Sequence, residues 1–504
     1  MSRAQAVLAN ARILRLFEGF MEARNPAFFS KVAGFFQNRK MEVCLFALSF
    51  LLLWGYMEPF MMEWDGYGYL RNIAEQRRSG LGLGRVGFIF PFAFIWGISR
   101  QFGVGAFDFH YIVSFFNILF SSTTVVVWYI LAGRLFKDRG LALGSALIMM
   151  FTKGFIRTGS EILTEPLAML LAYSSILVYS KALDEENAGL MAVSGLLFGY
   201  SLEVRESNMY MMLPFLVIYL EKEGPRGQAM KSLGLFTIAL ILAASIGPIA
   251  IYMNEGSRYT GTIKNWLTFN KSNIPHIWET LDTSIKRLEA GFGPLLPPVL
   301  GLIYLMARGK HAERLILYSL LAPLLAFSLF GCLPLRYFVT SFPSLALLTA
   351  VFLSAIADLS AALMKLERRA KTLFFALVAI WIALNFVQSH AVLAEDIKAS
   401  EKTEAYGLFL LNNFTEDTVF LVGGKTPMMK SYLVPLSGSK KIVIPNWTGE
   451  KLPAVVEAYR AEGKTIVVQP GGYSGAEKEE VDALMRMHAF KNIGMGLYEL
   501  KPGG

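Results

Sequence analysis

The sequence has 504 residues, of which 54% are hydrophobic and only 17% charged, whereas about a quarter of the residues are charged in soluble domains. The formal net charge is +9, but the basic residues form short clusters between apolar runs, which is typical of membrane-protein loops and argues against a nucleic-acid partner. Cys44 and Cys332 are the only cysteines, which excludes a disulfide framework and a cysteine-rich metal centre.

The N-terminal residues 1–40 contain seven Lys/Arg and two Glu, with apolar residues recurring near helical spacing. This pattern predicts a basic amphipathic segment on the cytoplasmic surface of the membrane. A solvated tail is the alternative interpretation.

Long apolar runs follow, and about 20 such residues suffice for a helix to cross the hydrocarbon core. The sequence predicts about eleven transmembrane helices within a membrane domain at residues 41–392. The predicted spans are 41–58, 106–133, 140–157, 164–182, 188–204, 208–221, 231–252, 292–308, 314–332, 337–357 and 371–392.

The segment 86–102 is also apolar, but the charge pattern argues against a crossing there. With the basic N-terminus inside, a crossing at 86–102 would move every later Lys/Arg cluster outside, against the positive-inside rule. We therefore predict an interfacial or re-entrant helix within a first outer loop, 59–105. A second large outer loop is predicted at 253–291, and the odd number of spans places the C-terminal residues outside the cytoplasm.

Residues 393–504 change character, because short β-prone runs alternate with helical stretches. The predicted strands are 418–422, 441–444, 464–468 and 496–500, and the predicted helices lie near 401–412, 450–462 and 476–488. This alternation predicts a small soluble α/β domain.

The first outer loop contains the run Trp64-Asp65-Gly66-Tyr67-Gly68-Tyr69. A carboxylate near the membrane surface suits a general base, so Asp65 is a candidate catalytic residue. Tyr67 and Tyr69 are candidate substrate-binding residues, although aromatic residues are also common at membrane interfaces. The alternative role for Asp65 is that of a loop acid capping the next helix.

A second polar group lies at the junction of two predicted spans. Arg157 and Glu161 are candidate substrate-binding residues, and Glu165 is a candidate catalytic residue. Thr164 or Ser160 could cap the following helix, in which case Glu165 would be a first-turn acid favoured by the helix dipole.

Two further clusters lie at outer ends of predicted spans. Arg205 and Glu206 interrupt an apolar stretch, where charges are costly unless they pair or face a cavity. Arg336 and Tyr337 open a later span, and an arginine on that side suggests an anionic partner. We take all four as candidate substrate-binding residues, because an arginine can grip phosphate with its bidentate fork. The alternatives are an Arg205–Glu206 pair at a tight hairpin and a snorkelling Arg336.

These clusters share one side of the membrane in the predicted topology. Arginines there could neutralise a lipid phosphate, aromatic rings could stack on sugars, and a carboxylate could accept a proton from an acceptor hydroxyl. The histidines are scattered, so we assign no metal site and no cofactor, while leaving divalent-metal dependence open.

The order of these motifs resembles the GT-C superfamily of integral membrane glycosyltransferases, especially the branch with the lipid A aminoarabinose transferases and the protein O-mannosyltransferases. The resemblance covers about residues 41–392. It rests on Trp64–Tyr69, the 86–102 helix, Gly133-Arg134-Leu135-Phe136, Ser160–Pro166, Arg205-Glu206, Arg336-Tyr337-Phe338 and Pro343.

The resemblance implies a polyprenyl-phosphate sugar as donor, a lipid, glycan or protein of the cell envelope as acceptor, and inverting transfer at the periplasmic face of the inner membrane. By position, Asp65 matches the family's base and Glu165 a second acidic position that is more often Asp. Arg205 and Arg336 match positions that bind the lipid-linked phosphate. The chain has Arg205-Glu206 where many relatives have Arg-Pro-Glu.

Two other functions compete with glycosyl transfer. A transporter or flippase of lipid-linked glycans predicts charges at span midpoints and an inverted repeat, and the sequence has neither. A non-catalytic membrane scaffold with an extracytoplasmic domain is the third hypothesis.

Overall fold

The computed structural model describes residues 39–59, 64–80, 84–221, 226–271, 277–308, 319–322, 324, 326, 335–413, 418–421, 452–470 and 475–500. The chain divides into two units, residues 1–48 and 49–504, and all the described elements except the start of helix α3 belong to the second unit. Only the last two residues of the predicted amphipathic segment 1–40 are among those described, so that prediction is not tested. The predicted strand at 441–444 and most of the predicted span at 314–332 also lie outside the described residues.

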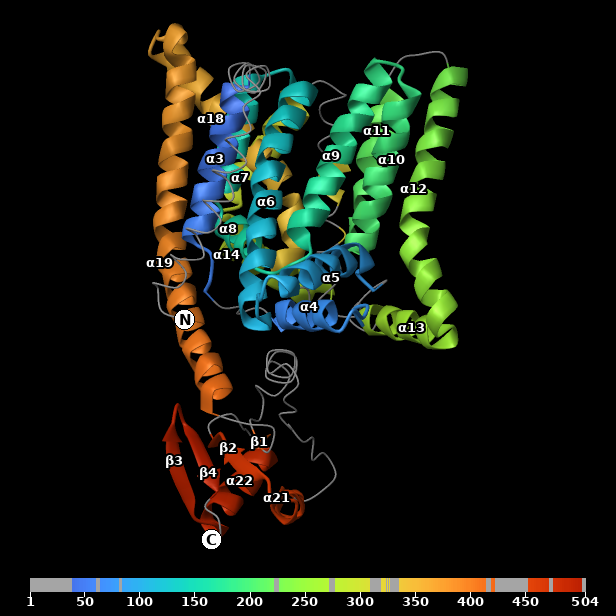
Figure 1. Ribbon diagram of the computed structural model, residues 1–504. Helices are drawn as coiled ribbons and strands as arrows, with labels where there is room; N and C mark the ends of the chain where they lie inside the picture. Colours follow the sequence, from blue (N-terminus) through green and yellow to red (C-terminus); the bar gives the residue numbers. More distant parts are fainter. Residues whose placement is uncertain are drawn as a thin grey trace, which may run out of the picture. The chain divides into compact units, whose positions relative to one another are not determined.

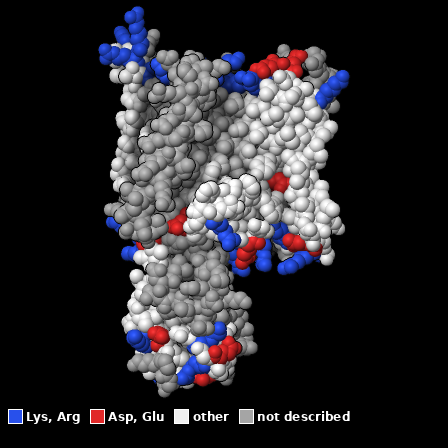
Figure 2. All heavy atoms as spheres, in the orientation of Figure 1, with Lys and Arg blue, Asp and Glu red and all other residues white. Residues whose placement is uncertain are grey.

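Long apolar helices make up most of the described structure (Figure 1). They are α3 (Lys40–Gly55), α6 (Ala106–Phe136), α7 (Arg139–Met150), α9 (Glu165–Asp184), α10 (Ala188–Val204), α11 (Met212–Glu221), α12 (Arg226–Glu255), α15 (Leu296–Arg308), α18 (Phe342–Leu363) and α19 (Ala370–Asn413). Within the described ranges, five helices are long and apolar enough to cross a membrane, or seven if each of two bent helix pairs is one span. Figure 2 shows charged side chains mainly at the two ends of these helices and few between them. The chain is therefore a multi-pass membrane protein, and the number eleven stays a prediction.

The helix ends follow local sequence signals. The Asp138 side chain accepts hydrogen bonds from two backbone amides at the start of α7, and Asn187 accepts one from Leu190 at the start of α10. Both are preferred N-cap residues. Pro166 lies in the first turn of α9, where its missing N–H costs nothing.

Three predicted spans differ from the helices in the structure. The predicted span 140–157 splits into α7 and α8 (Lys153–Ser160), which meet at 66°, because α8 has polar and charged residues and turns to pack on other elements. The helix α14 (Ile277–Phe292) meets α15 at 101°, so the apolar helix predicted from 292 begins only at Leu296. The predicted span 208–221 begins with the 3-10 turn η1 (Glu206–Met211) before α11.

Shorter helices run across the ends of the long ones (Figure 1). They are α4 (Trp64–Ala74), α5 (Val86–Gln101) and α13 (Ser257–Lys271). The predicted helix at 86–102 is thus present as α5, which buries Phe88, Phe92 and Trp96 in a core shared with α4, α6 and α10. Its other face exposes Phe90 and Phe94, as expected of a helix lying against lipid.

Helices α10 and α12 approach each other through small residues. A Cβ built on Gly195 would lie 2.3 Å from the Phe236 carbonyl oxygen, and one built on Gly199 would lie 2.4 Å from that of Leu240. Ala239 and Ala243 of α12 line the same seam. Small residues spaced four apart allow helix backbones to pack closely in membranes. This close packing holds α10, and therefore Arg205 directly after it, against α12.

Replacing Gly199 by leucine is therefore expected to destabilise the protein by about 1–3 kcal/mol or more, because overpacking forces the backbones apart. The matched control is Gly234→Leu on α12, where no heavy atom lies within 4 Å of the position that a Cβ would take. Thermal unfolding in detergent measures both variants. Equal melting temperatures for the two would contradict the close α10–α12 seam.

The C-terminal part contains a four-stranded sheet in the order β1-β2-β4-β3. The strands are β1 (Thr418–Leu421), β2 (Thr465–Val468), β3 (Phe490–Gly494) and β4 (Leu497–Leu500), with helices α21 (Leu452–Ala461) and α22 (Gly475–Met487) between them. β1 and β2 are parallel, and β4 pairs antiparallel with β2 and β3. Apolar residues of three strands and both helices form one core. Three strands lie at predicted positions, while β3 was not predicted.

Candidate functional site

Four segments that are distant in sequence bring opposite charges together. The Arg336 Nη2 donates a hydrogen bond to Asp65 Oδ2 over 2.7 Å, and Arg336 Nε lies 3.6 Å from Glu165 Oε1. The same Glu165 oxygen is 2.8 Å from Arg205 Nη1. Asp65 belongs to α4, Glu165 to α9, Arg205 to the end of α10, and Arg336 to the 3-10 helix η3 (Leu335–Ser341). The sequence-derived candidates Asp65, Glu165, Arg205 and Arg336 thus form one chain of ion pairs.

Arg85 is a fifth charged member that sequence reasoning missed. Its Nη1 donates to Tyr69 Oη over 3.1 Å and to Thr164 Oγ1 over 2.9 Å, and its Nη2 lies 3.3 Å from Glu206 Oε1. Arg85 adopts a left-handed conformation (φ 53°) directly before α5, which turns its side chain into the protein. An arginine between a turn and an apolar helix would otherwise be expected at the surface, so the sequence contains little signal for this role.

Burial differs sharply along this cluster. The Glu165 side chain is fully buried, and those of Arg85 and Arg205 are only 1% and 2% exposed. The Asp65 side chain is 20% exposed, more than those of the other two carboxylates in the cluster. Asp65 is therefore its accessible carboxylate, whereas Glu165 holds Arg205 and Arg336 in place.

Thr164 directly precedes α9 and Glu165 lies in its first turn, as the alternative interpretation expected, but Thr164 does not cap the helix with its side chain. That side chain accepts hydrogen bonds from Arg85 and from Arg205, the latter over 3.1 Å. Ser160 likewise bonds back to carbonyl oxygens of α8. Thr164 is thus a shared acceptor between two guanidinium groups that would otherwise repel each other.

Two of the three candidate tyrosines belong to this cluster. The Arg205 guanidinium lies over the Tyr337 ring, 4.2 Å from its centroid, a favourable cation–π arrangement. Burial raises the pKa of Tyr69 well above its ordinary value, so its hydroxyl stays protonated beside Arg85. Tyr67 is buried in the apolar core of α4 and α5, where burial and the neighbouring Glu58 raise its pKa.

The other two candidates, Arg157 and Glu161, pair elsewhere. Arg157 Nε donates to Glu161 Oε1 over 3.0 Å, and its Nη1 lies 3.9 Å from Asp396 Oδ2 of α19. Asn117 fixes the backbone here by donating to the carbonyl oxygens of Glu161 and Leu163. This second polar group ties α8 to α19.

The arginine cluster keeps unused donors. Arg85 Nε and Arg205 Nη2 are buried and have no hydrogen-bond partner within the described part of the chain. Buried donors are rarely left unsatisfied, so both are suited to an incoming anionic oxygen. In the same described ranges, no three His, Cys, Asp or Glu side chains gather in a way that would hold a metal ion.

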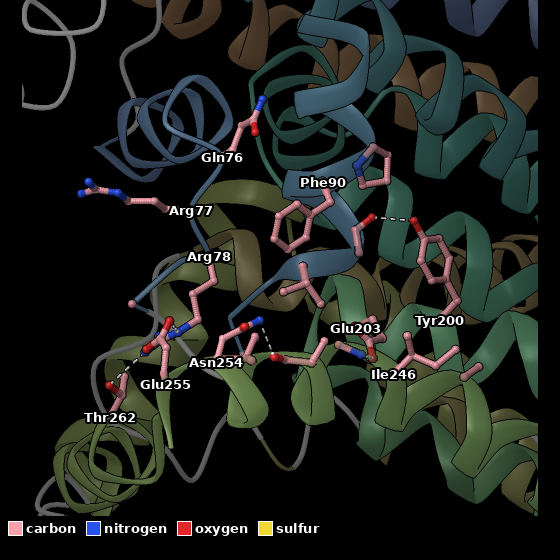
Figure 3. A pocket seen from close by; sticks show the side chains of 18 of the residues that line it. Gln76, Arg77, Arg78, Phe90, Tyr200, Glu203, Ile246, Asn254, Glu255 and Thr262 are labelled. Atoms are coloured by element: carbon pink, nitrogen blue, oxygen red, sulfur yellow. Dashed lines mark hydrogen bonds and ion pairs between the residues drawn. The ribbon is translucent and has the colours of Figure 1, made fainter. Parts of the chain in front are cut away.

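A cavity of about 1130 Å³ is lined by residues close in sequence to Arg85 and Arg205. Its walls come from α5, α10, α12 and α13 (Figure 3). Val86 and Glu203, each within two residues of an arginine of the cluster, line it, and Phe90, Ile246 and Ile251 give it an apolar surface. We call this cavity the groove.

Comparison with known proteins relates this arrangement to a fold. Residues 89–252 match the dolichyl-phosphate-mannose-protein mannosyltransferase family. The crystal structure of ArnT from Cupriavidus metallidurans bound to undecaprenyl phosphate superposes with a TM-score of 0.60 at 12% identity, covering 92% of this chain and 98% of ArnT. This chain has the fold of the GT-C membrane glycosyltransferases. The fold that the motif resemblance implied is thereby confirmed.

A second GT-C structure agrees. The archaeal oligosaccharyltransferase AglB from Archaeoglobus fulgidus, in complex with an inhibitory peptide and a dolichol-phosphate, has a TM-score of 0.51 at 11% identity and covers 86% of this chain and 70% of AglB. ArnT in the apo state gives the same TM-score, 0.60, as the lipid-bound form. No curated protein matches the sequence.

Proposed function

We propose that the protein is a glycosyltransferase that moves a hexosyl or pentosyl group from a polyprenyl-phosphate carrier to a lipid, glycan or protein acceptor of the cell envelope. The observation that supports this best is the cluster itself. One accessible carboxylate, Asp65, lies against Arg336, next to two buried arginines with unused donors. The GT-C fold, and the lipid phosphates bound to ArnT and AglB, agree with such a donor.

In the proposed reaction, Asp65 accepts the proton of an acceptor hydroxyl. The hydroxyl oxygen forms a bond to the anomeric carbon of the donor sugar while the bond from that carbon to the phosphate oxygen breaks. The bonding electrons leave with the lipid phosphate, whose added negative charge is stabilised by Arg85, Arg205 and Arg336. Attack from the opposite face gives inversion.

Glu165 has a supporting role in this proposal. It lies between Arg205 and Arg336 and is too deeply buried to meet the acceptor. Its charge balances two guanidinium groups in a site of low polarity, where uncompensated charges would be costly. We therefore assign Glu165 to positioning, although the sequence pattern suggested a direct catalytic role.

The same proposal places the protein in the inner (plasma) membrane with its N-terminus in the cytoplasm. The cluster and the C-terminal sheet then lie outside the cytoplasm. The argument for this orientation is the distribution of Lys and Arg between the predicted loops. Cysteine accessibility labelling at Ser257 and at Asp138, in a variant lacking Cys44 and Cys332, tests it: Ser257→Cys should react with an impermeant maleimide in intact cells and Asp138→Cys should not.

Arg85 should contribute to donor binding rather than to the fold alone. Replacing it by lysine keeps one charge but removes the fork that reaches Tyr69, Thr164 and Glu206 together. We expect kcat/KM for the donor to fall about tenfold or more, the equivalent of one charge-assisted hydrogen bond. Steady-state kinetics with varied donor measures this, and unchanged kinetics in Arg85→Lys would remove Arg85 from the donor site.

Transfer can be separated from transport with proteoliposomes. Purified protein is supplied with a polyprenyl-phosphate sugar carrying a radiolabelled sugar and with an envelope extract as acceptor. Glycosyl transfer predicts that the label moves to a new covalent product and that free polyprenyl phosphate accumulates. A flippase predicts that the labelled lipid changes leaflet without chemical change, and a scaffold predicts neither outcome.

A further inference from the structure

An ion pair held by two hydrogen bonds, Arg78–Glu255, lies among the residues that line the groove. Arg78 Nε donates to Glu255 Oε1 over 2.8 Å, and Arg78 Nη2 donates to Glu255 Oε2 over 2.6 Å. Thr262 lies 3.4 Å from the same nitrogen, and the guanidinium is 5.2 Å from the centroid of the Tyr259 ring. Figure 3 shows Arg78 pointing to Glu255 and Thr262, while Arg77 points away.

The groove changes from charged to apolar along α12. Glu255 is the last residue of the candidate span Lys231–Glu255, and Arg258 follows on α13. Ile251 and Ile246 line the groove one and two turns earlier. Lipids have the same order, with phosphate at the end of a span and hydrocarbon deeper, and the groove therefore suits an amphiphile with one anionic head group.

The ion pair is also connected to Arg85. A Cβ built on Gly84 (φ 100°) would lie 3.0 Å from Ile251 Cδ1 and 3.3 Å from Arg78 Cδ. Val86, directly after Arg85, packs with Ile251 and Tyr259 in one buried cluster. The residues on either side of Arg85 therefore contact Ile251, Tyr259 or Arg78.

The pair has the geometry of a phosphate site filled by a carboxylate. A guanidinium donates two parallel hydrogen bonds to a carboxylate or to a phosphate in the same way. Glu255 accepts both of these hydrogen bonds from Arg78. The Glu255 side chain is 31% exposed, whereas that of Arg78 is 11% exposed. The carboxylate is thus the partner that can move into water, leaving Arg78 in the wall of the groove.

The other carboxylate of the groove does not have this role. Glu203 lies on α10, where its Oε1 accepts a hydrogen bond from the Gly247 backbone over 2.8 Å. A Cβ on Gly247 would lie 2.0 Å from Glu203 Oε2. Glu203 is therefore fixed against α12 and is not bonded to Arg78.

We propose that Arg78 is a docking point for the phosphate of a lipid monophosphate, and that Glu255 occupies it until the lipid displaces the carboxylate. The lipid chain then lies along Ile251, Ile246 and Phe90. This inference rests on the proposed function, since it places the carrier lipid of that reaction in the groove before or after transfer. No covalent step is involved.

The test compares two variants that should change lipid affinity in opposite directions. Binding of undecaprenyl phosphate to the full chain in phosphatidylcholine nanodiscs is titrated for the unaltered protein, Glu255→Gln and Arg78→Gln. Removing the competing charge in Glu255→Gln should tighten binding about two- to fivefold, as for loss of a partly exposed ion pair. Arg78→Gln should weaken binding by a similar factor. A purely structural pair predicts weaker or unchanged binding in both variants.

Two controls sharpen the result. Asp282→Asn removes one negative charge from an exposed pair with Lys286 and should leave binding unchanged; equal tightening there would overturn the assignment to Arg78. Inorganic phosphate at the same concentration should not compete, and if it competes as well as the lipid, the site is a general anion site and the proposal fails.

Labelled-sugar transfer by the unaltered protein separates this inference from the proposed function. Transfer that occurs while Glu255→Gln binds lipid no more tightly would overturn the role of Glu255 alone. Tighter binding by Glu255→Gln without any sugar transfer would overturn the glycosyltransferase proposal and leave the lipid-phosphate site in place.

Discussion

The Asp65→Asn substitution is expected to lower the rate of sugar transfer by about 10²–10⁴-fold, the usual contribution of a general base. The amide oxygen can still accept the hydrogen bond from Arg336 that the carboxylate accepts over 2.7 Å, so the site should keep its shape. The variant lacks only a group that takes up a proton. Initial rates with labelled donor, at saturating donor and acceptor, measure the loss in kcat.

The matched control for this variant is Glu75→Gln. Glu75 follows the same helix, α4, and pairs with Arg71, so it tests a loss of carboxylate near the site without touching the cluster. We expect near-normal transfer in Glu75→Gln. Normal transfer in a folded Asp65→Asn would assign the proton to another group.

Replacing Glu165 by leucine should be the most destabilising single change in the cluster. It leaves the buried Arg205 and the largely buried Arg336 without their shared counter-charge, and removing one partner of a buried pair costs about 3–5 kcal/mol. Glu165→Gln should lie between leucine and the unaltered protein, because the amide keeps an acceptor but not the charge. Chemical or thermal unfolding in detergent gives the ranking.

An exposed ion pair provides the comparison. Asp184 pairs with Arg134 and is 56% exposed, so Asp184→Leu should cost only about 0–1 kcal/mol. If Glu165→Leu were no more destabilising than Asp184→Leu, the buried network would not support the fold. Loss of transfer in Glu165→Gln with little loss of stability would instead favour the direct catalytic role that the sequence suggested.

Much of the site could be predicted because membrane topology constrains it. Asp65, Glu165, Arg205 and Arg336 lie far apart in sequence, yet each follows or precedes an apolar run on the same predicted side. Apolar length and charge placement were enough to group them. The helix at 86–102 was predicted by the same reasoning and is present as α5.

The pairings could not be predicted in the same way. The buried position of Arg85 depends on a left-handed backbone before α5, which the sequence does not predict. Thr164 accepts hydrogen bonds from two arginines and makes no capping hydrogen bond with its side chain. For Arg157 and Glu161 a signal was available, since they lie four apart on one helical turn, where opposite charges attract. The structure shows them paired with each other.

The central claim is transfer of a sugar to an envelope acceptor through Asp65, and envelope mass spectrometry tests it most directly. Glycans are compared between cells lacking the protein and the same cells supplied with the unaltered chain or with Asp65→Asn at equal membrane abundance. We predict one sugar modification that is lost without the protein, returns with the unaltered chain and does not return with Asp65→Asn. Identical glycans in all three samples, or full restoration by Asp65→Asn, would contradict the claim.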